Sequence, residues 1–164
     1  MRRTILLSTA IISFSILSCK SQDKLNNTTQ QLSLKETQET NNMKSFISIF
    51  EIPATEITRA IHFYKAILEI NIEKMEFPEM QMGIFPYEGQ MVTGVIMKAE
   101  GYTPSANGVT IYLNGGNNLQ IILDKVEKNG GKILVPKSLH ADESGYYAIF
   151  LDSEGNKIGL HSPN

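Results

Sequence analysis

The sequence has little cysteine, no long hydrophobic run and no excess of charge of either sign. Cys19 is the only cysteine among the 164 residues, so no disulfide can form within the chain. Residues 45 to 164 contain none, which suits an oxidising compartment with no thiol chemistry to protect. The formal net charge is −2 and no basic cluster occurs. The composition therefore argues against binding to nucleic acid.

Several signatures of cofactor and catalytic sites are also missing. The chain has no G-x-G-x-x-G loop, no P-loop and no nucleophile elbow. The glycines near positions 115, 130 and 155 are typical of turns rather than of phosphate-binding loops.

The N-terminus has the pattern of an export signal. Met1-Arg2-Arg3 precedes a short apolar stretch that is too short and too interrupted to span a membrane, which takes about 20 apolar residues. We therefore predict a secretory signal at residues 1–18. Ile16-Leu17-Ser18-Cys19 resembles the lipobox of bacterial lipoproteins, and this resemblance implies acylation of Cys19. The alternative is an ordinary cleaved signal peptide with an incidental Cys19.

If Cys19 is acylated, the protein is anchored by lipid to a bacterial membrane in the cell envelope, outside the cytoplasm. Stable anchoring takes more than one acyl chain. Residues 19–44 are rich in Gln, Asn, Thr, Ser and Lys, with only scattered apolar residues. Such a segment buries too little surface to offset the entropy of ordering. We predict a flexible tether there, followed by a domain at residues 45–164 that is large enough for one core.

The first half of the domain has the pattern of one strand, one helix and three more strands. An apolar stripe with helical spacing runs from Ile57 to Leu68, with Thr55 as the expected N-cap. Alternating or β-branched runs predict strands at residues 46–52, 71–76, 81–87 and 91–98.

The second half repeats this order after a linker at residues 99–107. A helical stripe runs from Leu119 to Val126 and stops at Asn129-Gly130-Gly131. Strands are expected at residues 109–113, 132–136, 146–151 and 157–162, with a hairpin turn at Asp152–Asn156.

First strands and helix starts both recur after about 60 residues, as in an internal duplication. We therefore predict an α+β fold of two paired βαβββ modules, residues 45–98 and 107–164. Their strands would form a cupped, mostly antiparallel sheet with the helices outside and a cleft between the inner faces.

This pattern resembles the vicinal oxygen chelate superfamily, which includes glyoxalases, bleomycin-resistance proteins, fosfomycin-resistance enzymes and extradiol dioxygenases. The resemblance covers nearly all of residues 45–164. Its most specific segments are Phe50–Pro53, Arg59–Tyr64 and Asp152–His161.

Catalytic members of this superfamily hold a divalent metal with His, Glu or Gln at four inward strand positions. Counted from the quoted motifs, two of these positions fall on Ile49 and Gly159. The start of the second module's first strand places a third on Val109, and internal symmetry places the fourth near Gly94. None of these side chains can ligate a metal, so we predict neither a metal nor another cofactor.

Strand periodicity indicates what would line the cleft. With a period of two, Ile49 and Glu51 share one face, as do Val109 and Ile111, while His161 shares a face with Gly159. The predicted ligand-binding residues are Ile49, Glu51, Val109, Ile111 and His161. Such a cleft, apolar with few polar groups, is typical of small-molecule sites.

Two interpretations of Glu51 and His161 remain open. They form an acid–base or two-ligand pair, or Glu51 pairs with Arg59 and His161 hydrogen-bonds near the C-terminus. His140 lies in a loop that could close over a ligand. Lys137 is either exposed or meets an anionic ligand.

Three functions remain open, and whether any reaction is catalysed is undecided. The leading prediction is metal-free binding of a small molecule in the cleft of a lipid-anchored protein. The alternatives are a metal-dependent lyase, isomerase or dioxygenase with a displaced site built from Glu51, His161 and His140, and an envelope interaction module with a filled cleft. A homodimer is a further possibility.

Overall fold

The computed structural model of the protein describes residues 45–164. The predicted signal peptide, the predicted tether and Cys19 lie outside the described residues. Within residues 45–164, no helix is long and apolar enough to cross a membrane.

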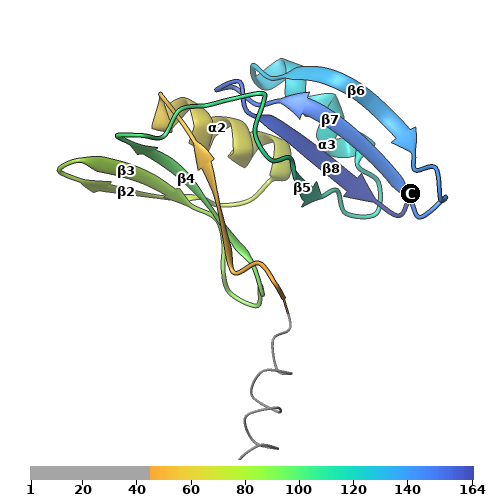
Figure 1. Cartoon of the computed structure of the whole chain (residues 1–164), viewed down its shortest axis with the longest axis horizontal. Helices are drawn as coiled ribbons and strands as arrows, with labels where there is room; N and C mark the ends of the chain where they lie inside the picture. Colours follow the sequence, from red (N-terminus) through yellow and green to blue (C-terminus); the bar gives the residue numbers. More distant parts are fainter. Residues whose placement is uncertain (1–44) are drawn as a thin grey trace, which may run out of the picture. The chain divides into compact units, whose positions relative to one another are not determined.

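The first module follows the predicted order of elements (Figure 1). It consists of β1 (Ile49–Pro53), α2 (Ile57–Leu68), β2 (Glu73–Phe77), β3 (Met80–Ile84) and β4 (Thr93–Ala99). The apolar stripe of α2 is buried, as its helical spacing predicts. The helix ends at Glu69, which adopts a left-handed conformation and donates its N–H to the Lys65 carbonyl.

The second module repeats the first. Its elements are β5 (Ile111–Asn114), α3 (Gln120–Val126), the 3₁₀ turn η1 (Glu127–Asn129), β6 (Lys132–Leu139), β7 (Tyr146–Leu151) and β8 (Lys157–Ser162). Gly130, with φ of 91°, ends this helical segment. The bounds of β7 and β8 are those predicted from the sequence.

Each module builds a four-stranded mixed sheet. The strand orders are β1-β4-β3-β2 and β5-β8-β7-β6, and Figure 1 shows the two sheets side by side. Strands β1 and β4 run parallel, as do β5 and β8, while the other neighbours are antiparallel. The predicted fold of two βαβββ modules is thus confirmed.

The two modules share one hydrophobic core on the helix-covered faces of the sheets. Ile52 and Ile96 of the first sheet and Leu160 of the second are almost fully buried in it. Phe63 of α2 lies against Phe150 of β7, with ring centroids 6.1 Å apart. Because this core crosses the boundary, neither module buries its apolar face alone.

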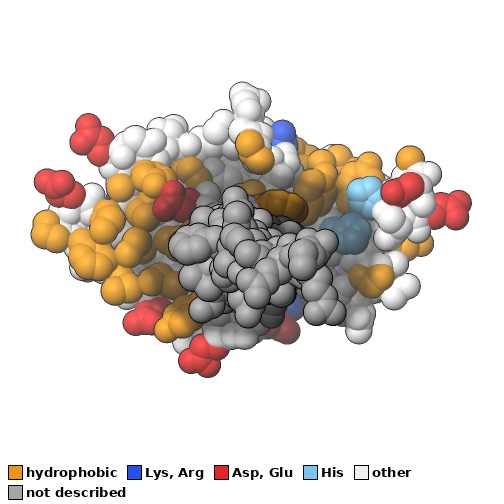
Figure 2. Space-filling model, turned by 60° about the horizontal axis from the view of Figure 1, so that its bottom comes forward, with side chains coloured by type: hydrophobic (Ala, Val, Ile, Leu, Met, Phe, Trp, Pro, Cys, Tyr) orange, Lys and Arg blue, Asp and Glu red, His pale blue; other side chains and the backbone are white. Residues whose placement is uncertain are grey.

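The opposite face of the first sheet carries no helix. Met82 of β3 pairs with Met75 of β2 and with Met97 of β4, so the three side chains point to the same side. Figure 2 shows hydrophobic side chains gathered over this part of the molecule.

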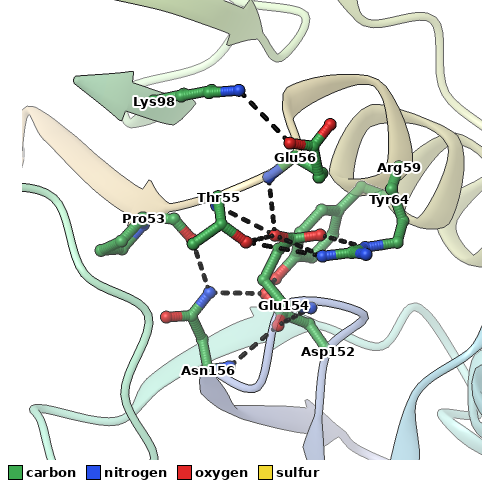
Figure 3. A network of polar contacts seen from close by, with 9 residues as sticks. All are labelled: Pro53, Thr55, Glu56, Arg59, Tyr64, Lys98, Asp152, Glu154 and Asn156. Atoms are coloured by element: carbon green, nitrogen blue, oxygen red, sulfur yellow. Dashed lines mark hydrogen bonds and ion pairs between the residues drawn. The ribbon is translucent and has the colours of Figure 1, made fainter.

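A carboxylate of the second module caps the helix of the first (Figure 3). Glu154, in the β7–β8 turn, accepts hydrogen bonds at Oε2 from the N–H groups of Thr55 (2.9 Å) and Glu56 (3.0 Å) and from the Thr55 hydroxyl (2.8 Å). Its Oε1 accepts from Arg59 Nε at 2.7 Å. The Glu154 side chain is fully buried, so these bonds satisfy donors that the start of α2 leaves open.

A second buried carboxylate supports the same turn. Asp152 accepts at Oδ2 from the Tyr64 hydroxyl (2.7 Å) and from Asn156 Nδ2 (2.9 Å). Asn156 Nδ2 also donates to the Pro53 carbonyl at 2.8 Å. Burial, and then the negative charge of Asp152, raise the pKa of Tyr64 well above its usual range, so the hydroxyl stays a proton donor.

The expected start of the first strand and the expected cap of the first helix were wrong. The first strand begins at Ile49 instead of residue 46, because its partner β4 begins at Thr93, opposite Ile49. The N-cap of α2 is Glu56, which makes no side-chain cap bond. Thr55 instead donates its hydroxyl to Glu154.

We predict that Glu154 makes folding acid-sensitive. Burial raises the pKa of Glu154, but the bonds from Arg59, Glu56 and Thr55 outweigh this and lower the pKa from 4.5 to about 2. Because the folded-state pKa is the lower one, the stabilisation is complete above about pH 5 and is lost as the pH falls towards 2. Because Arg59 is exposed to solvent, we discount this stabilisation of the folded state to on the order of 2 to 3 kcal/mol.

Glu154→Gln should therefore lower the free energy of unfolding at pH 7 by on the order of 2 kcal/mol. The difference from the unsubstituted protein should shrink as the pH falls from 5 to 2, as measured by urea denaturation across that range. Glu100→Gln, at an exposed carboxylate, serves as the control. An equal difference at pH 7 and pH 3 would contradict the assignment.

Candidate functional site

A groove that both modules line lies between the C-terminal end of α2 and the loop from β5 to α3. Its volume is about 660 Å³. The first module contributes the start of β4 and the loop before it, and the second contributes α3. The lining residues are Phe50, Leu68, Ile70, Phe85, Pro86, Gln90, Val92, Thr93, Gly94, Leu113, Asn114, Gly115, Gly116, Asn117, Asn118, Ile121 and Ile122.

The wall formed by the first module is aromatic. Phe50 of β1 meets Phe85 edge to face, with centroids 6.0 Å apart. Gly94 pairs with Phe50 across the parallel strands. A Cβ on Gly94 would lie 2.5 Å from the Phe50 ring, so glycine is required for Phe50 to lie across β4.

The opposite wall of the groove is a loop whose asparagine side chains and backbone N–H groups make hydrogen bonds. Asn114 Oδ1 accepts from the Gly116 N–H at 2.9 Å, and the Gly115 N–H donates to the His161 carbonyl at 2.7 Å. Asn118 Oδ1 accepts from the Gln120 N–H (3.1 Å) and from Lys137 Nζ (2.8 Å). The loop is therefore held at several points before any ligand arrives.

The predicted site residues do not converge on this groove. Glu51, Val109 and Ile111 line a smaller hollow of about 280 Å³ beside the linker between the modules. Ile49 lies on the helix-free face of the first sheet and is 57% exposed. His161 belongs to the second sheet and is exposed. Their role in binding stays a prediction.

The ion pair expected between Glu51 and Arg59 does not form. Arg59 binds Glu154, and Glu51 Oε2 accepts from the Tyr102 hydroxyl at 2.6 Å. The hydrogen bond to Glu51 is the main cause that raises the pKa of Tyr102.

The two C-terminal histidines do come together. The ring of His140 lies 5.4 Å from that of His161 and 4.7 Å from that of Tyr147. Lys137 is not available to bind an anion, because Nζ donates to Asn118 and lies 4.5 Å from the centroid of the Tyr146 ring.

The register of β5 differs from the expected one. Tyr112 pairs with Gly159 and Asn114 with His161, so these residues share the helix-free face. Ile111 packs instead against the core, and Val109 precedes the strand at 91% exposure.

The positions at which a superfamily metal is expected do not suit one. Ile49, Gly94, Val109 and Gly159 carry no donor atom, and the Tyr112 ring lies where a side chain on Gly159 would extend. Among residues 45–164, no three His, Cys, Asp or Glu side chains are grouped so as to hold a metal ion.

Sequence reasoning missed the residues that form the groove. Phe85, Ile121 and the loop Asn114–Asn118 were interpreted only as strand, helix and turn. One available signal was Ile121, an apolar residue one position outside the buried stripe of α3 and 60% exposed.

Comparison with known proteins identifies the family. The family model of the glyoxalase/bleomycin resistance protein/dioxygenase superfamily matches residues 47–160. The chain belongs to this superfamily. A comparison with curated protein sequences found no match.

Solved structures of the superfamily share the fold. TnmS3, an antibiotic-binding protein from Streptomyces sp. CB03234, is 18% identical with a TM-score of 0.57, over 73% of this chain and 97% of its own. A glyoxalase/bleomycin resistance protein from Albidiferax ferrireducens is 20% identical with a TM-score of 0.55, over 72% of this chain and 98% of its own. A glyoxalase I variant from Zea mays is 20% identical with a TM-score of 0.59, over 71% of this chain but only 46% of its own. These identities establish the fold alone.

We predict that Gly94→Ala displaces Phe50 from the groove wall. The added methyl group would meet a rigid ring, and overpacking of this kind costs about 1 to 3 kcal/mol. Thermal unfolding should show the loss. Gly108→Ala is the matched control, because nothing lies within 4 Å of its added Cβ. Equal stability of the two variants would contradict the close packing of Phe50 on Gly94.

Proposed function

We propose that this superfamily member binds a small molecule, without a metal, in the groove between its two modules. The observation that carries the proposal is the groove itself. Its volume of about 660 Å³ lies in the range of small-molecule sites, roughly 300 to 1,000 Å³. Its walls combine aromatic and aliphatic side chains with a few asparagine amides, the usual composition of such sites.

The chemistry of the lining favours binding over catalysis. General acid–base catalysis needs a titratable group within hydrogen-bond reach of the reacting atom. The groove is lined by no His, Asp, Glu, Lys, Cys or Tyr. Its one hydroxyl, on Thr93, donates to the Phe85 carbonyl at 3.4 Å.

The two alternatives have less support. A displaced metal site would need Glu51 beside His161 and His140, but Glu51 lies on the other sheet and binds Tyr102. Two histidines alone make a poor metal site. An interaction module with a filled cleft would leave the open groove that both modules line without a role. TnmS3, which shares the fold, is an antibiotic-binding protein, and this is a precedent for small-molecule binding as a function of the fold.

Binding can be tested by stabilisation against unfolding. Antibiotic-sized compounds should include some that raise the melting temperature of the protein. A ligand at 100 times its dissociation constant adds about 2.7 kcal/mol. Ile121→Glu should abolish this gain, because Ile121 lines the groove. Leu139→Glu should retain it, since Leu139 is similarly exposed but lies on β6, away from the groove. Stabilisation that survives Ile121→Glu would place the binding site elsewhere.

We further propose that Cys19 anchors the protein by lipid in the cell envelope. The support is the lipobox-like Ile16-Leu17-Ser18-Cys19 behind a basic start. A homodimer likewise stays a prediction.

In bacteria fed labelled palmitate, the protein should carry label and sediment with membranes. Cys19→Ser should lose the label, because no other cysteine exists to accept it. Ser21→Ala, two residues beyond, should behave as the unsubstituted protein does. Label retained by Cys19→Ser would rule the anchor out.

A further inference from the structure

The groove between the modules is free of charge along its whole lining. One residue in five of the chain is charged, yet none of the residues that line the groove carries a charge. An ion placed there would lose hydration without meeting an opposite charge, and such burial is costly. The groove therefore discriminates against ionic molecules.

Two lysines close to the groove, Lys125 and Lys137, are engaged elsewhere. Lys125, one turn beyond Ile121 on α3, pairs with Glu69 at the end of α2 at 2.7 Å. Lys137 Nζ donates to the side-chain oxygen of Asn118 and also lies over the Tyr146 ring. Neither lysine is left to neutralise an anion in the groove.

Two asparagines that line the groove, Asn114 and Asn118, retain unused donors. The Oδ1 atoms of Asn114 and Asn118 already accept backbone N–H groups. Their Nδ2 groups make no hydrogen bond within residues 45–164. A carbonyl or ether oxygen of a ligand can satisfy such donors without bringing a charge.

The aromatic wall stands opposite these amides. Phe50 and Phe85 meet edge to face, and Ile121 is 60% exposed beside the opening. A planar aromatic body gains contact area on these surfaces at little cost in conformational entropy.

We propose, as a refinement that rests on the proposed function, that the groove selects uncharged aromatic molecules that carry a carbonyl or ether acceptor. The acceptor lies at the Asn114 and Asn118 end, and the aromatic body lies against Phe50 and Phe85. This class of ligand follows from the charge-free lining and from the asparagine Nδ2 groups that remain as donors.

Two fluorescent probes that differ by one charge test the first part. N-phenyl-1-naphthylamine is neutral, and 1-anilinonaphthalene-8-sulfonate adds only a sulfonate to the same rings. Titrated into the full chain, the neutral probe should bind at least tenfold more tightly. The groove-specific signal is the part that Ile121→Glu removes and Leu139→Glu retains.

The outcomes separate the two proposals. Similar affinities for both probes, with Ile121 required for each, would overturn the selection against charge and leave the proposed function standing. Binding of neither probe in a manner that depends on Ile121 would count against both.

A third probe tests the acceptor. N-phenyl-1-naphthamide inserts a carbonyl into the neutral probe and should bind several-fold more tightly than its parent. Asn114→Asp retains the oxygen that accepts from Gly116 but removes the Nδ2 donors. The advantage of the amide probe over its parent should fall in this variant. An unchanged ratio, or no advantage in the unsubstituted protein, would overturn the assigned acceptor site.

Discussion

The start of α2 in the first module is held to the second module by one carboxylate. Glu154 sits in a turn of the second module and caps α2 of the first by accepting from the N–H groups of Thr55 and Glu56, from the Thr55 hydroxyl and from Arg59. The groove lies at the opposite end of α2, beside Leu68 and Ile70. A helix of 12 residues is a rigid bar about 18 Å long. The cap at one end of α2 therefore helps to set the width of the groove at the other.

Aromatic packing joins the same two places through the core. Tyr64 binds Asp152 with its hydroxyl, and its ring lies 5.6 Å from that of Phe85 in the groove wall. Phe63 continues the contact to Phe150 in the second module. Because close-packed interiors transmit small displacements, the groove wall is supported by the same residues that hold the modules together.

Local patterns predicted most of this fold, and contacts distant in sequence account for what they missed. The stripes of α2 and α3 and the hairpin of β7 and β8 followed from periodicity and turn residues. Val109 looked like strand because it is β-branched, yet β5 begins at Ile111, opposite Ile158 of β8. The sequence indicated Glu154 only as a turn residue, since its partners Thr55 and Glu56 lie 99 and 98 residues away. The groove was missed because its polar wall is a loop, and periodicity carries no information about loops.

The contacts that join the two modules and the lining of the groove also differ in their chemistry. The contacts between the modules, which act as a rigid frame, include the buried carboxylates Asp152 and Glu154, and both accept hydrogen bonds from donors of the first module. The groove contains no group that ionises between pH 2 and 10. Acid therefore protonates the carboxylates that join the modules and leaves the chemistry of the groove lining unchanged. A loss of binding at low pH would report protonation of carboxylates outside the groove, such as Glu154, since no side chain in the lining can take up a proton. In the proposed function, the superfamily fold provides a rigid support on which neutral walls, rather than metal ligands, determine what can bind.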